Sequence, residues 1–391
     1  MLTEIRFVGK TKSIFATVVI CMFLSVLAFG GQNTADNPVS KPEQSDLFVS
    51  GQEGYHTYRI PSVIVTQKGT VLAFCEGRKF RVNDASPTDM VMKRSFDDGR
   101  TWTPMQVVVK GVPDAIMDPC PVVDQTTGII WLVYDRYPKD FNDAAGFGMN
   151  SGTAWVMHST DDGATWSAPV NITATTKRHE WSVIAHGPGV GIAMRCGRLV
   201  IPCYRSIGPD PNTEYSFAIY SDDHGKSWHL GGETGPMTNE SQVVELADGS
   251  LMLNMRTSRK TGCRVMAISR DNGMTWSEPV DVPELIEPAC QASILRYSWP
   301  DKDGKSHILF CNPACKDDRI KLTVRLSYDE GRSWPVSKLL YAGPSAYCCL
   351  AALKDGDIAC LYEGGDKYQH EKIIFARFSL EWLTDGKDKS N

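Results

Sequence analysis

The sequence predicts an all-β fold, and two observations carry this prediction. The pattern Ser-x-Asp-x-Gly-x-(Thr/Ser)-Trp occurs five times, and its aspartates follow one another at intervals of 64, 62, 48 and 58 residues. Between the copies there is no amphipathic helical pattern of about 12 residues or more. Such regular spacing indicates an internal repeat. We call each copy an aspartate box; the boxes span residues 95–102, 159–166, 221–228, 269–276 and 327–334.

Each aspartate box is expected to form the turn between two strands. The aspartate can accept hydrogen bonds from backbone amides of its own turn, the glycine permits a positive φ, and the tryptophan covers the apolar underside of the hairpin. Alternating or apolar runs precede the boxes, for example at 89–94 and 265–269, and they are typical of strands. Calcium loops also contain aspartate-rich turns, but the glutamate and spacing of an EF-hand are absent, so we expect no metal here.

The period of the repeat predicts a six-bladed β-propeller with four-stranded antiparallel blades. About 360 residues remain after an N-terminal segment is set aside, which is about 60 residues for each of six blades. A C-terminal strand at 372–378 is expected to complete a blade that begins near 47–49, closing the ring. We therefore divide the chain into a signal peptide at 1–31, a polar linker at 32–45 and the propeller at 46–391.

The N-terminal segment has the layout of an export signal. Lys10 and Lys12 precede an apolar run at 14–29, and small and polar residues follow from Gly30. This layout predicts export to the periplasm or the cell exterior. An uncleaved membrane anchor is the alternative, although about 16 apolar residues fall short of the ~20 that span a bilayer.

Charge and cysteine spacing exclude several other classes. The chain carries a net charge of −5, and the positively charged segment 1–31 contributes +2, so the remainder has −5 − 2 = −7. An acidic protein is a poor nucleic-acid binder. The twelve cysteines fit neither a stapled scaffold nor paired CxxC metal ligands, and most are expected to be buried, with a Cys311–Cys315 disulfide left open. There is no HExxH motif, and we expect no metal or other cofactor.

The motif Tyr58-Arg59-Ile60-Pro61 followed by five aspartate boxes resembles the exo-α-sialidase (neuraminidase) family, in particular bacterial-type retaining sialidases with aspartate-box (BNR) repeats. The resemblance runs from about residue 48 to 383. It implies a six-bladed propeller that hydrolyses terminal α-linked sialic acids from glycoproteins, glycolipids and oligosaccharides. It also implies no cofactor, no nucleic acid and no stable protein partner.

The resemblance implies three arginines that hold the carboxylate of sialic acid. Guanidinium groups suit this task because they bind carboxylates bidentately and keep their charge. The matching residues are Arg59, Arg256 and Arg319, and Arg325 is a nearby alternative to Arg319. Glu363 matches a glutamate that orients the first arginine.

A neutral nucleophile is implied as well, since an anionic one would meet the carboxylate next to the anomeric carbon. Sialidases use a tyrosine, and Tyr347 in Gly343-Pro344-Ser345-Ala346-Tyr347 matches it. A tyrosine needs a base to take its proton at neutral pH. Glu240 matches this base, and Glu245 is the less favoured candidate.

The loop after the second strand of the first repeat is expected to supply the general acid. Asp84 matches the acid/base aspartate of the family, and Asp89 is its rival, although a structural role suits Asp89 better because it begins a strand. Arg78 matches an arginine that contacts the sugar ring. Met117 and Asp118 resemble a pair that lines the sugar pocket, and an ordinary core position is the alternative for Met117.

The chain also departs from the family pattern around the site. Cys348 and Cys349 stand where serine and aspartate are expected, Ser241 stands where cysteine is frequent, and residues 80–82 are bulkier than usual. These departures bear on substrate preference and remove no catalytic group. A non-catalytic glycan-binding or assembly propeller and a trans-sialidase are the alternative functions, and the complete set of candidate residues favours the hydrolase.

Overall fold

The computed structural model describes residues 40–84, 86–139, 141, 151–302 and 304–388. Strands dominate these residues, which confirms the all-β prediction. The expected signal peptide at 1–31 lies outside the described residues. Within the described ranges, no helix is long and apolar enough to cross a membrane. The short helical elements of these ranges are α1 (Thr173–Thr176), η1 (Pro211–Thr213) and α2 (Leu380–Thr384).

The largest sheet of the described residues has eight strands in two groups of four. Neighbouring strands pair antiparallel within each group, whereas β4 and β6 meet in parallel at Thr88 and Ala115, so the joint between the groups is narrow. Its strands are β2 (Thr57–Val65), β3 (Val71–Arg78), β4 (Thr88–Ser95), β5 (Gln106–Val109), β6 (Ala115–Val123), β7 (Ile130–Tyr137), β8 (Thr153–Ser159) and β9 (Val170–Asn171).

Two smaller antiparallel sheets follow along the described chain. The first has the order β10-β12-β13-β14, with β11 also paired to β12, and the second has the order β15-β16-β17-β18. Their strands are β10 (Val183–His186), β11 (Ile192–Ala193), β12 (Leu199–Ser206), β13 (Tyr215–Ser221), β14 (His229–Pro236), β15 (Thr238–Glu245), β16 (Leu251–Thr257), β17 (Cys263–Ser269) and β18 (Val280–Ile286).

The fourth sheet of the described residues joins the two ends of the chain. Its order is β1-β24-β23-β22-β21-β20-β19, and the long strand β22 pairs with β21 through Val336–Pro344 and with β23 through Ser345–Ala352. Its strands are β1 (Glu43–Val49), β19 (Ser293–Ser298), β20 (His307–Pro313), β21 (Ile320–Ser327), β22 (Val336–Ala352), β23 (Ile358–Gly364) and β24 (Lys372–Phe378).

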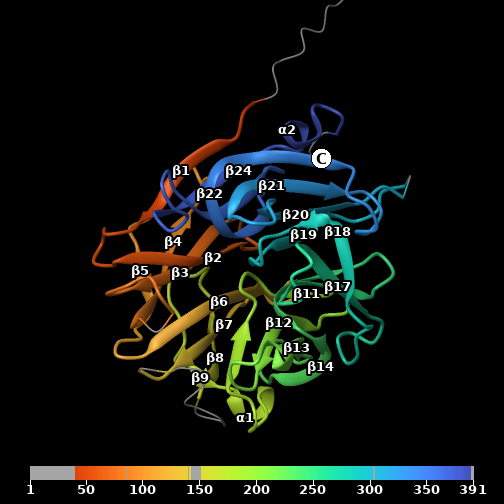
Figure 1. The fold of residues 1–391 in the computed structure, drawn as a ribbon. Coiled ribbons are helices and arrows are strands. Elements are labelled where there is room, and N and C mark those ends of the chain that lie inside the picture. The colour runs from red at the N-terminus through yellow and green to blue at the C-terminus, as the bar shows by residue number, and fades with distance from the viewer. Residues whose placement is uncertain (1–39, 85, 140, 142–150, 303, 389–391) are drawn as a thin grey trace, which may run out of the picture. The chain divides into compact units, whose positions relative to one another are not determined.

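The expected pairing of the N-terminal strand with the C-terminal strand is confirmed. β1 runs antiparallel to β24, with Glu43 opposite Arg377 and Val49 opposite Lys372 (Figure 1). β1 begins at Glu43, inside the segment expected as a linker at 32–45, because its backbone amides and carbonyls find partners on β24.

The aspartate boxes form the predicted turns. In each box the serine is the last residue of a strand and its hydroxyl accepts the amide of the box glycine at 2.8–2.9 Å. The aspartate accepts the backbone amide and the hydroxyl of the Thr or Ser four residues later; in the first box these bonds to Asp97 are 2.8 and 2.6 Å. The box glycines have φ between 77° and 90°, as expected, and the residue before each also has positive φ.

Two box tryptophans contact aromatic side chains outside their own hairpins, in addition to the predicted cover of the hairpin. Trp102, which follows β4, lies 5.0 Å from the ring of Phe375 on β24, and Trp166, which follows β8, lies 5.9 Å from Phe74 on β3. A Cβ on Gly99 would lie 2.1 Å from the Phe375 ring, so the glycine is required for this contact as well as for its φ. These two boxes therefore pack one group of strands against the preceding group.

Burial of the cysteines is confirmed for most of the described chain. Of its eleven cysteines, all free, nine are buried, whereas Cys196 is exposed and Cys315 is half-buried. Cys311 does not pair with Cys315, because its sulfur is directed into the core and lies 3.8 Å from that of Cys360.

We predict that Asp97→Ala lowers the free energy of unfolding at pH 7 by about 1–2 kcal/mol, because hydrogen bonds to Ser95 and Thr101 are lost. The hydroxyl and amide of Thr101 lower the pKa of Asp97 to about 2 from 3.8. A lowered pKa in the folded state stabilises it above about pH 4, and this contribution disappears as the pH falls towards 2. The difference in the free energy of unfolding between wild type and Asp97→Ala, measured by denaturant titration, should therefore shrink as the pH falls from about 4 towards 2.

Asp97→Asn is the matched control, because its amide oxygen still accepts one hydrogen bond but does not titrate. It should lose less stability than Asp97→Ala. A difference between wild type and Asp97→Ala that stays constant from pH 7 to pH 2 would contradict the prediction.

Candidate active site

The candidate residues gather at the ends of the strands opposite the aspartate boxes. Arg78 at the end of β3 lies beside Thr88 at the start of β4, whereas the serine of the first box lies at the far end of β4, beside Val71. The same antiparallel pairing places the end of β16, where Arg256 lies, away from the box that follows β17. The boxes and the candidate site therefore occupy opposite edges of the sheets.

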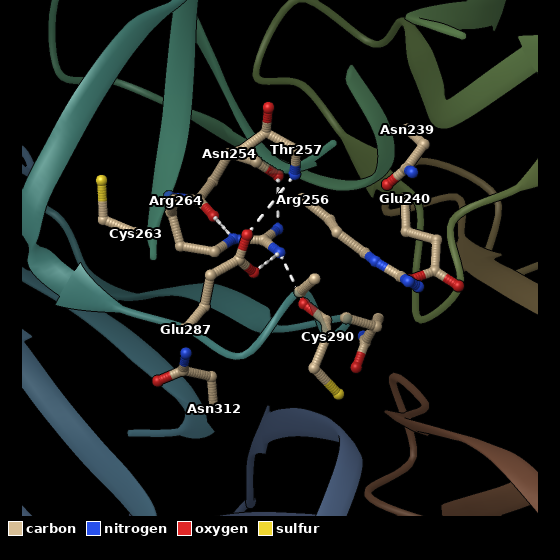
Figure 2. A network of polar contacts seen from close by, with 12 residues as sticks. Asn239, Glu240, Asn254, Arg256, Thr257, Cys263, Arg264, Glu287, Cys290 and Asn312 are labelled. Atoms are coloured by element: carbon tan, nitrogen blue, oxygen red, sulfur yellow. Dashed lines mark hydrogen bonds and ion pairs between the residues drawn. The ribbon is translucent and has the colours of Figure 1, made fainter. Parts of the chain in front are cut away.

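A tyrosine and a glutamate form the centre of the site. Tyr347 on β22 donates its hydroxyl hydrogen bond to Oε1 of Glu240 on β15. Arg256, at the end of β16, donates to Oε2 of Glu240 at 2.6 Å and to the Tyr347 hydroxyl at 3.3 Å. Figure 2 shows the Arg256 side chain reaching Glu240. Tyr347 and Glu240 are both buried, so water has little access to this proton-sharing pair.

The tyrosine is held in its neutral form. Burial and the charge of Glu240 raise the pKa of Tyr347 well above its usual value, and the charges of Arg256 and Arg59 oppose this only in part. A proton acceptor is therefore needed before Tyr347 can attack carbon, and Glu240 is in contact with it.

Two further arginines surround the tyrosine ring. The guanidinium carbon of Arg59 lies 5.1 Å from the ring centre, and that of Arg319 lies 5.7 Å from it. Arg319 also donates to the carbonyl oxygen of Ala289 at 3.2 Å. Arg325, the alternative to Arg319, instead donates to Asn312 and is buried. The structure thus brings Arg59, Arg256 and Arg319 together.

Glu363 holds Arg59 in place. Its Oε1 accepts hydrogen bonds from Nε of Arg59 at 2.6 Å and from the amide of Ile60 at 2.9 Å, and its Oε2 accepts from the amide of Tyr347 at 3.3 Å. Ile60 has a φ of 58°, which bends β2 at this point. Burial favours the neutral acid, but the charge of Arg59 and the hydrogen bonds from Arg59 and Ile60 outweigh it and keep the pKa of Glu363 below its usual value. The expected contact between Glu363 and Arg59 is present.

Asp84 lies at the exposed rim of the site. Its carboxylate is 2.8 Å from Arg78, and its side chain is 75% exposed whereas that of Arg78 is fully buried. Desolvation beside the pocket raises the pKa of Asp84, but the charges of Arg78 and Arg59 outweigh it and lower the pKa below its usual value. In the described structure the aspartate is therefore ionised at neutral pH.

The rival carboxylates are engaged elsewhere. Asp89 accepts hydrogen bonds from the Tyr55 hydroxyl and the Gly111 amide, both at 2.9 Å, and pairs with Lys79 at 3.1 Å. Glu245 binds the backbone amide and the side chain of Arg195. Both residues therefore have structural partners outside the Tyr347 cluster.

A cavity of about 330 Å³ lies beside Asp84, at the rim of the site. Asp84, Met117 and Asp118 line it, together with Tyr204 and Glu214, so Met117 reaches the pocket as well as packing against buried residues. Burial, reinforced by the nearby charge of Asp135, raises the pKa of Asp118 well above its usual value. Both effects disfavour the charged carboxylate form of Asp118 in the pocket wall.

Sequence reasoning missed the carboxylates behind this wall. The buried Glu76 accepts hydrogen bonds from Arg78 at 2.7 and 2.8 Å and from the amide of Asp118 at 3.0 Å, so it connects Arg78 to Asp118. Asp135 binds His186 at 2.7 Å. Glu76 and Arg78 are two residues apart on one strand and therefore share a face, which was an available signal for their contact. The contact of Asp135 with His186 depends on which distant strands lie side by side.

The described residues contain no cluster of side chains suited to binding a metal ion. Among the described residues, no group of three or more His, Cys, Asp or Glu side chains is placed to hold a metal ion. The chemistry available in the described site is that of a tyrosine, carboxyl groups and guanidinium groups.

Known proteins are similar to the chain over most of its length. Residues 69–360 match the BNR repeat-like domain family. A sialidase of Micromonospora viridifaciens is 36% identical over 87% of the chain, which spans 54% of that relative, and an exo-alpha-sialidase of Arthroderma benhamiae is 31% identical, with 87% of each protein covered. The solved structure of the Hadza microbial sialidase Hz136 has a TM-score of 0.78 at 31% identity and covers 87% of this chain and 69% of that one.

The chain is therefore an all-β protein with BNR repeats and an arginine-rich site. Within that class, the chain belongs to the sialidase family. It spans about half the length of the Micromonospora relative.

We predict strong energetic coupling between Arg59 and Glu363. Replacing either residue alone leaves a buried charge without its partner and should cost about 3–5 kcal/mol of the free energy of unfolding. The double variant Arg59→Met/Glu363→Leu removes both charges and should cost clearly less than the sum of the single variants. Denaturant unfolding of the four proteins measures the coupling, and additive costs would show that the two residues act independently.

Proposed function

We propose that the protein is an exo-α-sialidase that hydrolyses terminal α-linked sialic acids from glycoproteins, glycolipids and oligosaccharides with net retention. The observation that carries this proposal is the contact of Tyr347 with Glu240 inside a cluster of three arginines. A nonulosonic sugar presents a carboxylate next to its anomeric carbon. The arginines supply the charge that binds this carboxylate, and the neutral tyrosine avoids repulsion from it.

In the first step, Tyr347 attacks the anomeric carbon while Glu240 accepts the proton of its hydroxyl. The bond from that carbon to the leaving oxygen breaks, and Asp84 donates a proton to this oxygen. The result is a glycosyl-enzyme in which the sugar is bound to the Tyr347 oxygen. Arg59, Arg256 and Arg319 hold the carboxylate throughout.

In the second step, Asp84 removes a proton from water as the water oxygen attacks the anomeric carbon. The bond to Tyr347 breaks, and Glu240 returns its proton to the tyrosine oxygen. Two displacements at one carbon give net retention. After this step Asp84 and Tyr347 are protonated and Glu240 is ionised, as they were in the complex with substrate. Asp84 takes up its proton from solvent when the substrate binds and returns it when the product leaves.

The substrate itself prepares Asp84 to act as the acid. Without substrate, Arg78 and Arg59 keep the pKa of Asp84 low. A bound carboxylate offsets the positive charge of Arg59, and the sugar displaces water from the exposed side chain. Both effects disfavour the ionised form of Asp84 and raise its pKa.

We further propose that the sheets form a six-bladed propeller. Each half of the eight-stranded sheet and each half of the seven-stranded sheet then counts as a blade, since β4–β6 and β22 are the joints. A cavity of about 350 Å³ supports this arrangement, because it is lined by residues of β2, β6, β11, β15, β19 and β22, one strand from each proposed blade.

We also propose that residues 1–31 direct export, on the strength of Lys10 and Lys12 before the apolar run. The exported protein should then lack these residues. N-terminal sequencing of the protein recovered outside the cytoplasm tests this, and recovery of the intact segment in the membrane fraction would favour the anchor instead.

We predict that Tyr347→Phe lowers kcat for an aryl α-sialoside by about 10³-fold or more, because the nucleophile is removed. Tyr341→Phe is the matched control, because Tyr341 lies on the same strand and its hydroxyl donates to the carbonyl oxygen of Gly365 rather than to Glu240. The control should retain most of the activity, and both variants should unfold near the wild-type temperature. Wild-type turnover by a folded Tyr347→Phe enzyme would refute the assignment.

Release of free sialic acid from sialyl-lactosides separates the alternative functions. Hydrolysis predicts free sialic acid even in the presence of excess galactoside acceptor, and retention predicts the α-anomer as the first product in a nuclear magnetic resonance time course. A transfer product that dominates over free sugar would favour a trans-sialidase, and binding without release would favour a glycan-binding protein.

A further inference from the structure

A further arginine–carboxylate pair, Arg264 with Glu287, is buried close to Arg256. Arg264 on β17 is fully buried, and its guanidinium group makes four hydrogen bonds (Figure 2). Nε donates to the side chain of Asn254 at 2.8 Å and one terminal nitrogen donates to the Asn254 carbonyl at 3.2 Å. The other terminal nitrogen donates to Glu287 at 2.9 Å and to the carbonyl oxygen of Cys290 at 2.8 Å.

Arg264 and Glu287 form hydrogen bonds with residues on both sides of Arg256. Asn254 precedes Arg256 by two residues on β16 and is bound through side chain and carbonyl. Glu287 accepts the amide of Thr257, the residue directly after Arg256, at 3.4 Å. The direction in which the Arg256 side chain leaves its strand is therefore set by contacts to Arg264 and Glu287.

The same pair shapes the segment that binds Arg319. Ala289, whose carbonyl accepts from Arg319, has a φ of 52°, a backbone conformation that alanine rarely adopts. It is flanked by Glu287 and Cys290, and both are bound to Arg264. Cys290 also packs against Tyr347 in a small buried cluster. Contacts on either side thus hold the strained residue where its carbonyl meets Arg319.

We propose that Arg264 and Glu287 are a positioning pair that sets the geometry of Arg256 and Arg319 and thereby the affinity of the site for the substrate carboxylate. This inference rests on the proposed sialidase function. Both side chains are buried, so neither touches the substrate. Their effect is transmitted through Asn254 and Thr257 to Arg256, and through Ala289 to Arg319.

The choice of arginine is explained by geometry. A buried ion pair is seldom more stabilising than apolar residues of similar volume, so stability alone is a weak reason for this one. A guanidinium group presents donors in fixed directions and reaches Asn254, Glu287 and Cys290 at once, whereas the single ammonium of lysine cannot. Directional bonding to β16 at Asn254 and to two points of the segment 287–290 is the property that positioning requires.

The test compares Arg264→Lys and Asn254→Ala with wild type in hydrolysis of an aryl α-sialoside. If the pair positions the arginines, KM should rise about tenfold while kcat changes less than about threefold, because the lost contact is made in both the ground state and the transition state. Competitive inhibition by free sialic acid should weaken in parallel, and inhibition by its methyl ester, which has no carboxylate charge, should stay within about twofold.

Arg296→Lys is the matched control. Arg296 also forms a largely buried ion pair, with Glu330 at 2.5 Å. It lines the cavity of about 350 Å³ described above and is not part of the Tyr347 cluster. This variant should lower the unfolding temperature and leave KM and the preference for sialic acid over its ester unchanged. A merely structural role of Arg264 predicts the same result for Arg264→Lys.

The outcomes separate the two proposals. If wild type neither hydrolyses the sialoside nor binds sialic acid, the sialidase proposal and the positioning proposal are both overturned. If wild type is active and both variants keep the wild-type KM and the wild-type preference for sialic acid over its ester, only the positioning proposal is overturned. Should Arg264→Lys fail to fold, Asn254→Ala decides, because it removes one hydrogen bond and leaves the buried ion pair intact.

Discussion

Positive charges gathered in one small volume repel one another, and this repulsion is the constraint that shapes the site. The protein answers it with carboxylates placed behind the arginines: Glu363 contacts Arg59 and Glu240 contacts Arg256. Arg319 is held by a backbone carbonyl oxygen and adds its charge to the cluster. Each carboxylate neutralises one arginine, and the guanidinium groups of Arg59 and Arg319 still lie close to the Tyr347 ring. A site built in this way favours an anionic ligand.

The aspartate-box turns and the candidate site lie at opposite ends of the strands. At one edge, the aspartate boxes use local hydrogen bonds and a tryptophan to fix where a strand ends and which neighbour it packs against. At the other edge, residues such as Arg78 and Arg256 stand at strand ends. Because the turns at the first edge are nearly identical, the loops at the second edge can differ in length and chemistry while the strands beneath them stay in register.

What the sequence could predict depended on the range of the interactions. The box turns depend on residues within eight positions of one another, so their conformation and the flanking strands followed from local chemistry. The residues of the cluster were found through family resemblance, and the structure places them together. The roles of Glu76, Arg264 and Ala289 were not predicted, because each depends on which strands lie side by side and in what register. The packing of Trp102 on Phe375 was missed for the same reason.

The pairing of β1 with β24 also has a consequence in time. Glu43–Val49 is among the first described segments to be synthesised, and Lys372–Phe378 is among the last. The sheet that contains both, and with it Glu363 and the second half of β22, cannot be completed until nearly the whole chain is available. The ion pair between Arg59 and Glu363 spans 304 positions and is subject to the same delay. The contacts of Glu363 with Arg59 and Tyr347 therefore form only after residue 363 has been synthesised, so a nascent chain that ends earlier carries aspartate boxes without these contacts.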